Sequence, residues 1–251
     1  KHLPNVKEIF LEDDTFTIDR NRVLEVCRDI KERDLNLIWS CNVRANLDHD
    51  ILKVMKDAGC RILIVGYESG NQQVLNNIKK GIALKQAEDF TRSAKQLGLR
   101  IFGCFMIGLP GDTKGSIEDT FHFAKKLGPD MVFFQQAVPF PGTEFYEWAK
   151  YNGYLKTQDY SKWFDETGRL DTLVDQPGLN GDDIKKIREN LMLRYYLDPK
   201  HILFTLKRNL HPYELIRVMN YAKDYFAFLM LQKIKRMGKE EMPTVNPKHE
   251  E

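Results

Sequence analysis

The sequence contains no cysteines at the close spacing that local metal sites use. Its four cysteines are scattered through 251 residues with no CxxC or CxxxC spacing: Cys27, Cys41, Cys60 and Cys104. They therefore form no metal motif that can be read from adjacent residues. Their neighbours in the chain are apolar, so we expect reduced thiols within the core.

The sequence also lacks an excess of one charge and a long hydrophobic run. Lys and Arg number 38 and Asp and Glu 36, which leaves a net charge of +2 and gives no electrostatic reason to expect a nucleic-acid partner. No apolar run reaches the length of a membrane span, and the first residues do not have the pattern of a signal peptide. We therefore expect a cytoplasmic protein.

The composition is that of a globular protein with a substantial core. Hydrophobic residues make up 42% of the chain and charged residues 29%. This favours one large domain, or one domain with an extension. The chain begins at Lys1 rather than at a methionine, and KHLPNVKEI is typical of a helix end that enters a strand. We expect the chain to be part of a longer protein.

Short apolar runs alternate with longer amphipathic segments along the first half of the chain. The runs are dense in branched and aromatic residues, as strands buried on both faces are, and fall at 6–12, 36–42, 61–66, 100–107 and 130–138. The predicted helices are 19–33, 48–58, 71–78, 84–97 and 113–127. Caps such as Asp19, Asp48 and Thr113 begin several of them, and glycines end them at Gly59, Gly98 and Gly128.

The alternation predicts successive right-handed βα units around a parallel sheet. Five units indicate an α/β fold, either most of a (β/α) barrel or an open, barrel-like sheet. We assign the barrel part to 1–155, an irregular linker to 156–180, a helical C-terminal extension to 181–238 and a disordered tail to 239–251. A break in the helical extension is predicted at Asp198–Pro199.

Charged, small and turn-forming residues follow every predicted strand. Ligands of parallel sheets bind at the carboxyl ends of the strands, where loops and helix amino termini converge. The successive strands are followed by Glu12-Asp13-Asp14, by Asn42 and Arg44, by GYESG with Gly66, Glu68 and Ser69, by GLPGDT from Gly108 to Thr113, and by PFPGT from Pro139 to Thr143. The sequence therefore predicts a ligand site at one edge of the sheet.

Some of these motifs have a simpler structural interpretation. GLPGDT can be only a turn that leads into a helix capped by Thr113, and PFPGT has the same weakness. GYESG and the three acids are harder to explain by stability, because one acid would suffice to cap the helix near residue 19. Carboxylates bind ammonium groups and ribose hydroxyls through charge-assisted hydrogen bonds. A nucleoside that carries an amino acid has both kinds of donor.

The chain resembles the radical S-adenosylmethionine (radical SAM) superfamily, and within it the cobalamin-binding group that includes the anaerobic Mg-protoporphyrin monomethyl ester cyclases and hopanoid-biosynthesis enzymes. The resemblance runs from about residue 5 to 155 through EIFLEDDTFT, WSCNVRAN, MKDAGCRILIVGYESGNQQVLNNIKKG, FGCFMIGLPGDT and VPFPGTEFY. It implies a partial (β/α)6 TIM-like barrel of parallel strands with a helical C-terminal extension, and S-adenosylmethionine bound across the strand ends.

The resemblance also implies roles for residues at matching positions. Glu12 and Asp13 would lie near the methionyl amino group or the substrate, and Arg44 would make a polar contact to S-adenosylmethionine or substrate. Gly66, Glu68 and Ser69 belong to the motif that faces the ribose and methionyl part. The remaining implied contacts are Lys80 to the methionyl carboxylate, Met106, Ile107 and Gly108 to adenine, and Gln135 and Gln136 to the substrate inside the barrel.

One departure from the family pattern is large. The family holds its 4Fe-4S cluster with three cysteines in a CxxxCxxC loop, and this sequence has no such loop. We expect the loop and a cobalamin-binding domain to lie upstream of Lys1, and we expect this chain alone to be inactive.

The longer protein would cleave S-adenosylmethionine to a 5'-deoxyadenosyl radical, with an electron donor such as flavodoxin or ferredoxin, and then methylate, cyclise or rearrange a small-molecule substrate. The substrate classes that the resemblance indicates are tetrapyrroles, lipids and natural products.

Two other interpretations remain open at this point. The first is a radical SAM enzyme without cobalamin, similar to methylthiotransferases or to coproporphyrinogen oxidase. The second is a non-catalytic barrel that binds a nucleotide-like ligand. Because the first strand of the barrel would be missing from this chain, residues 6–12 would form an open sheet edge, through which we expect the chain to self-associate.

Overall fold

The computed structural model describes residues 6–164, 168, 170–208 and 223. The chain divides between Asp198 and Pro199 into two compact units, and each is described by itself. The predicted disordered tail at 239–251 lies outside the described residues, as does nearly all of the predicted helical stretch beyond residue 208.

The first unit is built on one sheet of five parallel strands in the order β1-β2-β3-β4-β5. Every connection between neighbouring strands contains a helix, as parallel pairing requires. The predicted α/β class with parallel strands in chain order is therefore confirmed. The strands are β1 (Ile9–Leu11), β2 (Trp39–Val43), β3 (Cys60–Glu68), β4 (Arg100–Ile107) and β5 (Met131–Gln136).

Two strands differ in length from their predicted ranges. β1 covers three residues of the predicted 6–12, since it lies at the edge of the sheet and pairs only with β2. β3 is longer than the predicted 61–66 because it lies between two strands, of which β2 pairs with it as far as Val65 and β4 as far as Glu68. The pattern of apolar residues does not show how many neighbouring strands a strand pairs with, so it does not predict the strand's length.

The predicted helices form close to their predicted ranges, and the predicted caps are confirmed. The Asp19 side chain accepts hydrogen bonds from the Asn21 and Arg22 amides, and the Asp48 side chain accepts one from the Ile51 amide. Thr113 and Ser116 form a reciprocal capping box. The helices are α1 (Arg20–Glu32), α2 (His49–Asp57), α3 (Gln72–Asn77), α4 (Leu84–Gln96) and α5 (Lys114–Leu127), with a 3-10 turn, η1, at Phe16–Ile18.

Gly59 shows why the turn between α2 and β3 requires glycine. Its φ of +93° is a conformation that side chains disfavour. A Cβ atom at this position would lie 2.0 Å from the Leu37 carbonyl oxygen, which is too close for any substitution without a backbone shift. The turn therefore ends α2 and brings β3 directly against β2.

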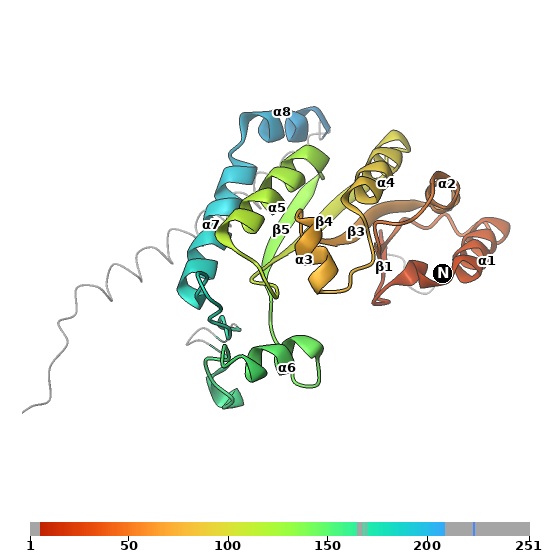
Figure 1. Cartoon of the computed structure of the whole chain (residues 1–251). Helices are drawn as coiled ribbons and strands as arrows, with labels where there is room; N and C mark the ends of the chain where they lie inside the picture. The colour runs from red at the N-terminus through yellow and green to blue at the C-terminus, as the bar shows by residue number, and fades with distance from the viewer. Residues whose placement is uncertain (1–5, 165–167, 169, 209–222, 224–251) are drawn as a thin grey trace, which may run out of the picture. The chain divides into compact units, whose positions relative to one another are not determined.

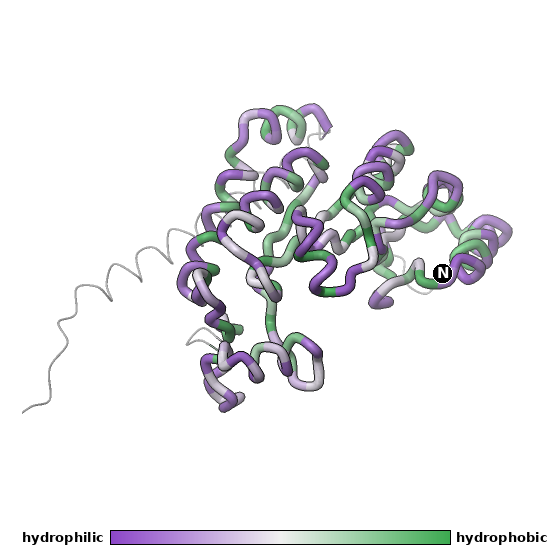
Figure 2. Tube along the Cα trace, in the orientation of Figure 1, coloured by the Kyte–Doolittle hydropathy of each residue, from purple (hydrophilic) through white to green (hydrophobic). Residues whose placement is uncertain are grey.

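The helices α1, α2, α4 and α5 form a row along one side of the sheet (Figure 1). Their contacts with the strands are apolar, and Figure 2 shows hydrophobic colouring along the central strands and much hydrophilic colouring on the helices. On this side Tyr67 stacks on Phe105, and the Tyr67 hydroxyl bonds to Thr91 of α4. We call this the outer face of the sheet.

Beyond β5 the chain forms α6 (Glu144–Tyr151), a 3-10 turn, η2, at Tyr160–Lys162, and α7 (Gly181–Tyr196). Figure 1 shows α6 beyond the carboxyl end of β5. α7 packs along β5, where the Tyr196 hydroxyl accepts from the Val132 amide and donates to the Val132 carbonyl. These bonds satisfy backbone groups at the open edge of β5. The second unit begins with α8 (Pro199–Arg208), so the helical stretch is broken at Asp198–Pro199.

Candidate functional site

The carboxyl ends of all five strands lie at one edge of the sheet, because every neighbouring pair is parallel. Polar residues of distant sequence positions are brought to this edge. Glu12 follows β1, Arg44 follows β2, Glu68 ends β3 and Gly108 follows β4. Gln135 is the second-last residue of β5. The structure therefore brings together the strand ends that the sequence analysis listed separately.

The face of the sheet opposite the helices is partly open and mostly apolar. The strand register places its residues in continuous rows, since paired residues on parallel neighbours point to the same face. Met131 and Phe133 are 38% and 42% exposed on this face, whereas Val132 and Phe134 beside them are buried on the outer face. We call this the inner face, defined by Phe10, Ser40, Asn42, Ile62, Ile64, Gly66, Phe102, Cys104, Met106, Met131, Phe133 and Gln135.

An ion pair stands where β3 ends. Lys80 Nζ lies 2.7 Å from Glu68 Oε1, and both side chains are less than one-fifth exposed. Glu68 has a φ of +64°, which a residue with a side chain rarely adopts. A Cβ on Gly66 would lie 2.5 Å from Glu68 Oε1 and 3.3 Å from Lys80 Nζ, so glycine leaves the space that the pair occupies.

Arg44 presents a buried donor that has no partner. Its guanidinium donates through NH2 to the backbone carbonyl of Lys80, which holds the side chain beside the Glu68–Lys80 pair. Its Nε–H is buried and has no hydrogen-bond partner among the residues that the structure describes. Burial of an unsatisfied cationic donor is costly, so this Nε–H is a candidate contact for an acceptor.

The three acids after β1 are in different surroundings. Glu12 is exposed. Asp13 is half-buried, its carboxylate accepts from Arg22 of α1 at 2.9 Å, and its carbonyl accepts from the Asn42 side chain at 2.9 Å. Asp13 thus links β1 to α1 and β2, whereas Glu12 and Asp14 are exposed at the strand end.

The GLPGDT loop after β4 is organised by Asp112. One carboxylate oxygen accepts from the Gly108 amide at 3.0 Å and the Leu109 amide at 3.2 Å, and the other accepts from the Ser116 hydroxyl. Burial raises the pKa of the Asp112 carboxyl, against the opposing effect of these three donors. The loop is therefore a closed turn leading into α5, as the simpler interpretation of the motif predicts.

The three residues predicted beside adenine lie on different sides of the chain. Met106 belongs to the inner face and packs against the apolar cluster of Val74, Leu109 and Ala137. Ile107 is fully buried on the outer face. The Cα of Gly108 faces Ile184 of α7, whose Cδ1 would lie 2.8 Å from a Cβ at this position. Only Met106 faces the open side of the sheet.

Ser69 and Gln136 are also turned away from the inner face. Ser69 is 1% exposed, and its hydroxyl lies 3.1 Å from the Thr120 hydroxyl of α5. Gln136 is buried on the outer face and donates to the Leu170 carbonyl at 2.7 Å. Gln135 is exposed on the inner face beside Met106. Strand alternation allows only one residue of the Gln135–Gln136 pair to face a ligand, and it is Gln135.

Sequence reasoning missed two residues that shape this edge of the sheet. Gln176, in the predicted irregular linker, is buried and bonds to the backbone of the GLPGDT loop. Asp112 was treated only as part of a motif, although it holds two amides of the loop. The Asp112-x-x-x-Ser116 spacing at a helix start was a usable signal for the second case, whereas no local pattern marks Gln176.

The four cysteines do not fit a metal cluster. Cys27, Cys41 and Cys60 are buried on the outer side, and Cys104 is partly exposed on the inner face. Burial raises the pKa of Cys27 and of Cys104 to about 11, which opposes the thiolate form that iron requires. Within the part of the chain that the structure describes, no group of three His, Cys, Asp or Glu residues could hold a metal ion.

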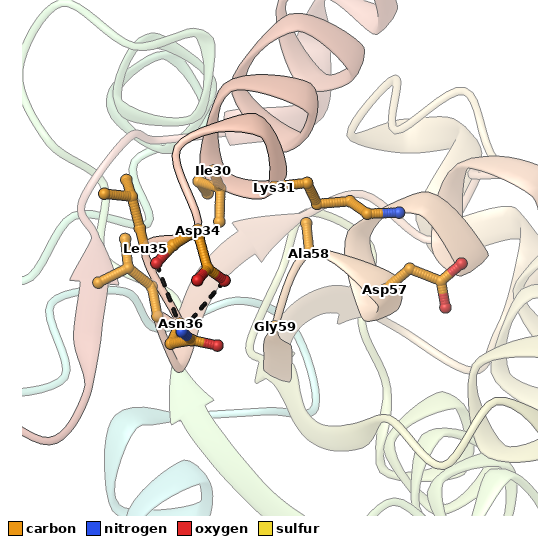
Figure 3. A pocket seen from close by; sticks show the side chains of 9 residues that line it. Ile30, Lys31, Asp34, Leu35, Asn36, Asp57, Ala58 and Gly59 are labelled. Carbon is orange, nitrogen blue, oxygen red and sulfur yellow. Dashed lines mark hydrogen bonds between the residues drawn. The ribbon is translucent and has the colours of Figure 1, made fainter.

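A hollow of about 390 Å³ lies at the other end of the sheet, near the amino ends of β2 and β3 (Figure 3). Its wall includes the turn at Asp34, where Asn36 donates to the Asp34 carbonyl and carboxylate. It contains no arrangement of the kind seen at Arg44 and Glu68. We therefore place the candidate site at the carboxyl ends of the strands and not in this hollow.

Comparison with known proteins gives consistent matches. Residues 1–124 match the family model described as the radical SAM superfamily. The chain is 34% identical over 199 residues to an uncharacterized methyltransferase of Pyrococcus horikoshii, which covers 79% of this chain and 42% of that protein. It is 26% identical over 140 residues to the anaerobic magnesium-protoporphyrin IX monomethyl ester cyclase of Rubrivivax gelatinosus, which covers 55% of this chain and 25% of that protein.

A solved structure shows the same fold. The radical S-adenosylmethionine methyltransferase TsrM from Kitasatospora setae, determined with cobalamin and a [4Fe-4S] cluster, matches with a TM-score of 0.63 and 18% identity. The match covers 78% of this chain and 44% of that chain. The chain thus spans less than half the length of each of these three proteins. None of the helices within the described ranges is long and apolar enough to cross a membrane.

Proposed function

This chain carries a domain of the radical SAM superfamily, and on that basis we propose that it is the part of a radical SAM enzyme that binds S-adenosylmethionine. The observation that carries the proposal is the buried Nε–H of Arg44, which has no partner in the described ranges, beside the Glu68–Lys80 pair. The guanidinium of Arg44 suits the carboxylate of an adenosyl amino acid. The carboxylate of Glu68 suits its hydroxyl or ammonium groups.

We assign roles to residues by the groups that their side chains present. Arg44 and Lys80 would bind the methionyl carboxylate, and Glu68 would accept from ribose hydroxyls or the methionyl ammonium. Glu12 would add a second acceptor from the neighbouring strand end, and Met106 would pack against adenine. Asp13, Ser69, Ile107, Gly108 and Gln136 would act indirectly, because their side chains or Cα atoms contact other parts of the chain.

The cluster that the family uses would be held outside these 251 residues. The four cysteines present lack the CxxxCxxC spacing, and the chain covers 42% of the Pyrococcus horikoshii methyltransferase. A 4Fe-4S cluster, when bound, supplies the electron that cleaves S-adenosylmethionine. We therefore propose that this chain binds the nucleoside but does not cleave it without the remainder of the enzyme.

The inner face favours a substrate with a large apolar part. Phe102, Phe133 and Met131 line it, and Gln135 provides a polar group near the carboxyl edge. A tetrapyrrole, a lipid or an apolar natural product would suit this surface. Methylation, oxidative cyclisation and rearrangement are the reactions we propose, with cobalamin supplied by another domain for methyl transfer, as the structure of TsrM contains cobalamin.

Two further parts of the proposal concern location and partners. The four cysteines are free thiols, which fits a reducing compartment such as the cytoplasm, where an electron donor of the flavodoxin or ferredoxin type would act. The outer edge of β1 has no strand beside it among the described residues, so we propose that the isolated chain self-associates there.

The binding proposal is tested by titrating the 15N-labelled chain with S-adenosylmethionine and following backbone amide shifts. We expect shifts at Arg44, Gly66 and Glu68, and none at the opposite end of the sheet around Asp57 and Gly59. Shifts confined to that opposite end, or a preference for ATP over S-adenosylmethionine, would support a nucleotide-binding protein of another kind.

Activity requires a second experiment with the longer protein. It would be reconstituted anaerobically with iron, sulfide and a reductant, and 5'-deoxyadenosine formation would be measured. Absence of 5'-deoxyadenosine from a protein with a fully formed cluster would contradict the enzymatic part of the proposal.

A further inference from the structure

One side chain bridges the GLPGDT loop from more than sixty residues away in the sequence. Gln176 Nε2 donates to the Leu109 carbonyl at 3.1 Å, and Gln176 Oε1 accepts from the Gly111 amide at 3.3 Å. Gln176 is 6% exposed, so water does not readily replace either bond. A single primary amide therefore satisfies one acceptor and one donor of the loop backbone.

The rest of the loop is held as well. Asn77 of α3 donates to the Pro110 carbonyl at 3.1 Å, and Asp112 accepts from the Gly108 amide. Ile184 of α7 fills the space against Gly108. In the Gly108–Thr113 loop the backbone amides therefore donate to groups of the protein. They are not available to bind a phosphate.

The loop is coupled to the inner face through Leu109. Leu109 is 5% exposed and belongs to the same apolar cluster as Met106, the residue that we propose packs against adenine. The carbonyl of Leu109 is the group to which Gln176 donates. A change at Gln176 would therefore reach, through Leu109, the apolar cluster against which Met106 packs.

We propose that Gln176 is a positioning residue that fixes the Gly108–Thr113 loop, and with it Met106, in the conformation that receives the adenosyl group. The link to the adenosyl group rests on the function proposed above, whereas the bracing of the loop does not. The segment around residue 176 is on this view part of the ligand site and not merely a linker.

The two hydrogen bonds from residue 176 to the loop require a side chain that both donates and accepts, as glutamine does. Methionine has a similar volume but offers no hydrogen bonds, so it leaves the Leu109 carbonyl and the Gly111 amide unsatisfied. Glutamate retains an acceptor for Gly111 but, when ionised, has no donor for Leu109. Protonation of that glutamate restores the donor. Asp175 offers a matched control, because it is adjacent in the chain and accepts from the Gly181 amide at the start of α7.

The bracing is tested by amide hydrogen exchange in the whole chain. In Gln176→Met we expect the Gly111 amide to exchange roughly fivefold to tenfold faster, the effect of losing one buried hydrogen bond. Gln176→Glu and Asp175→Ala should leave that amide protected. Unchanged exchange at Gly111 in Gln176→Met would overturn the proposal, whether or not the chain binds S-adenosylmethionine.

The positioning role is tested by the affinity for S-adenosylmethionine at matched thermal stability. We expect Gln176→Met and Gln176→Glu to bind about threefold to tenfold more weakly at pH 7, since one or two net hydrogen bonds are lost. The Gln176→Glu variant should recover affinity as the pH is lowered, whereas Gln176→Met should not. Equal weakening in Asp175→Ala would overturn the positioning role. If the unaltered chain binds no S-adenosylmethionine, the proposed function fails while the exchange experiment still decides the bracing.

Discussion

Lys80 Nζ lies 2.7 Å from Glu68 Oε1, at a point where Glu68 holds a left-handed backbone with a φ of +64°. A residue with a Cβ pays roughly 1–2 kcal/mol for this conformation. The strain places the carboxylate beside Lys80 and Arg44, at the carboxyl edge of the sheet. Strained residues of this kind concentrate at ligand sites, which agrees with the function proposed for this edge.

Replacement of Glu68 by glycine should destabilise the protein less than replacement by alanine. Both variants lose the ion pair, but glycine relieves the positive φ, so we expect Glu68→Gly to be about 1 kcal/mol more stable than Glu68→Ala. Urea denaturation of the two variants measures the difference. At Glu88, within α4, the order should be reversed, because glycine destabilises helix interiors. Equal stabilities at position 68 would show that its backbone is not strained.

Arg44→Lys should weaken binding of S-adenosylmethionine about tenfold or more, since lysine cannot present the Nε–H while also donating through a second nitrogen to the Lys80 carbonyl. Isothermal titration calorimetry would measure the dissociation constant. Arg61→Lys is the matched control, because Arg61 pairs with Glu8 at the amino end of the sheet. Equal losses of affinity in the two variants would argue against a direct contact from Arg44.

The pH dependence of stability should contain a contribution from Asp112. Burial raises the pKa of the Asp112 carboxyl above its ordinary value of 3.8, so the folded protein holds this proton more tightly than the unfolded chain. The resulting stability is fully present below the unfolded-state pKa and is lost as the pH rises through the folded-state pKa.

Asp112→Asn removes this titration and keeps an acceptor for the Gly108 and Leu109 amides. The difference in unfolding free energy between the original protein and Asp112→Asn should therefore fall as the pH rises from about 3.5 to about 7. Urea denaturation at several pH values measures it, and a constant difference would contradict the prediction. Asp112→Ala should cost about 1–3 kcal/mol at any of these pH values, because two buried amides lose their acceptor.

Self-association through β1 should depend on the backbone of Phe10. The Ile9 amide donates to the carbonyl of Ile38, the residue before β2, so in a parallel ladder the amide of the next residue, Phe10, points to the open edge. Phe10→Pro removes that donor without breaking the pairing with β2, and should reduce association measured by light scattering. Phe10→Ala removes the same exposed ring but keeps the amide, so it should associate more than Phe10→Pro. Equal association in these two variants would attribute the effect to the ring.

The sequence was informative wherever the chemistry is local. Asp19 and Thr113 begin helices as predicted, since a cap is decided by a side chain and an amide two or three residues apart. The five strands and their order follow from apolar runs separated by amphipathic segments. The strand-end residues Arg44 and Glu68 could be located in advance because parallel strands place all their carboxyl ends at one edge.

Contacts between distant segments could not be predicted in this way. Gln135 and Gln136 are adjacent and identical, and only the register with Met106 and Ile107 decides which of them faces the inner side. Gln176 lies in a stretch with no periodic pattern, and its partners, Leu109 and Gly111, are identified only by the folded chain.

The sequence by itself determined the secondary structure, the parallel α/β class and the edge of the sheet where the polar residues gather, because these depend on short-range periodicity and on strand direction. Only the tertiary structure decided which polar atoms have hydrogen-bond partners within the protein and which do not. Asp13 and Ser69 bond to residues of α1 and α5, whereas the buried Nε–H of Arg44 has no partner within the described part of the chain. Whether a polar group is satisfied depends on every neighbour around it, and those neighbours come from parts of the chain that only folding brings together.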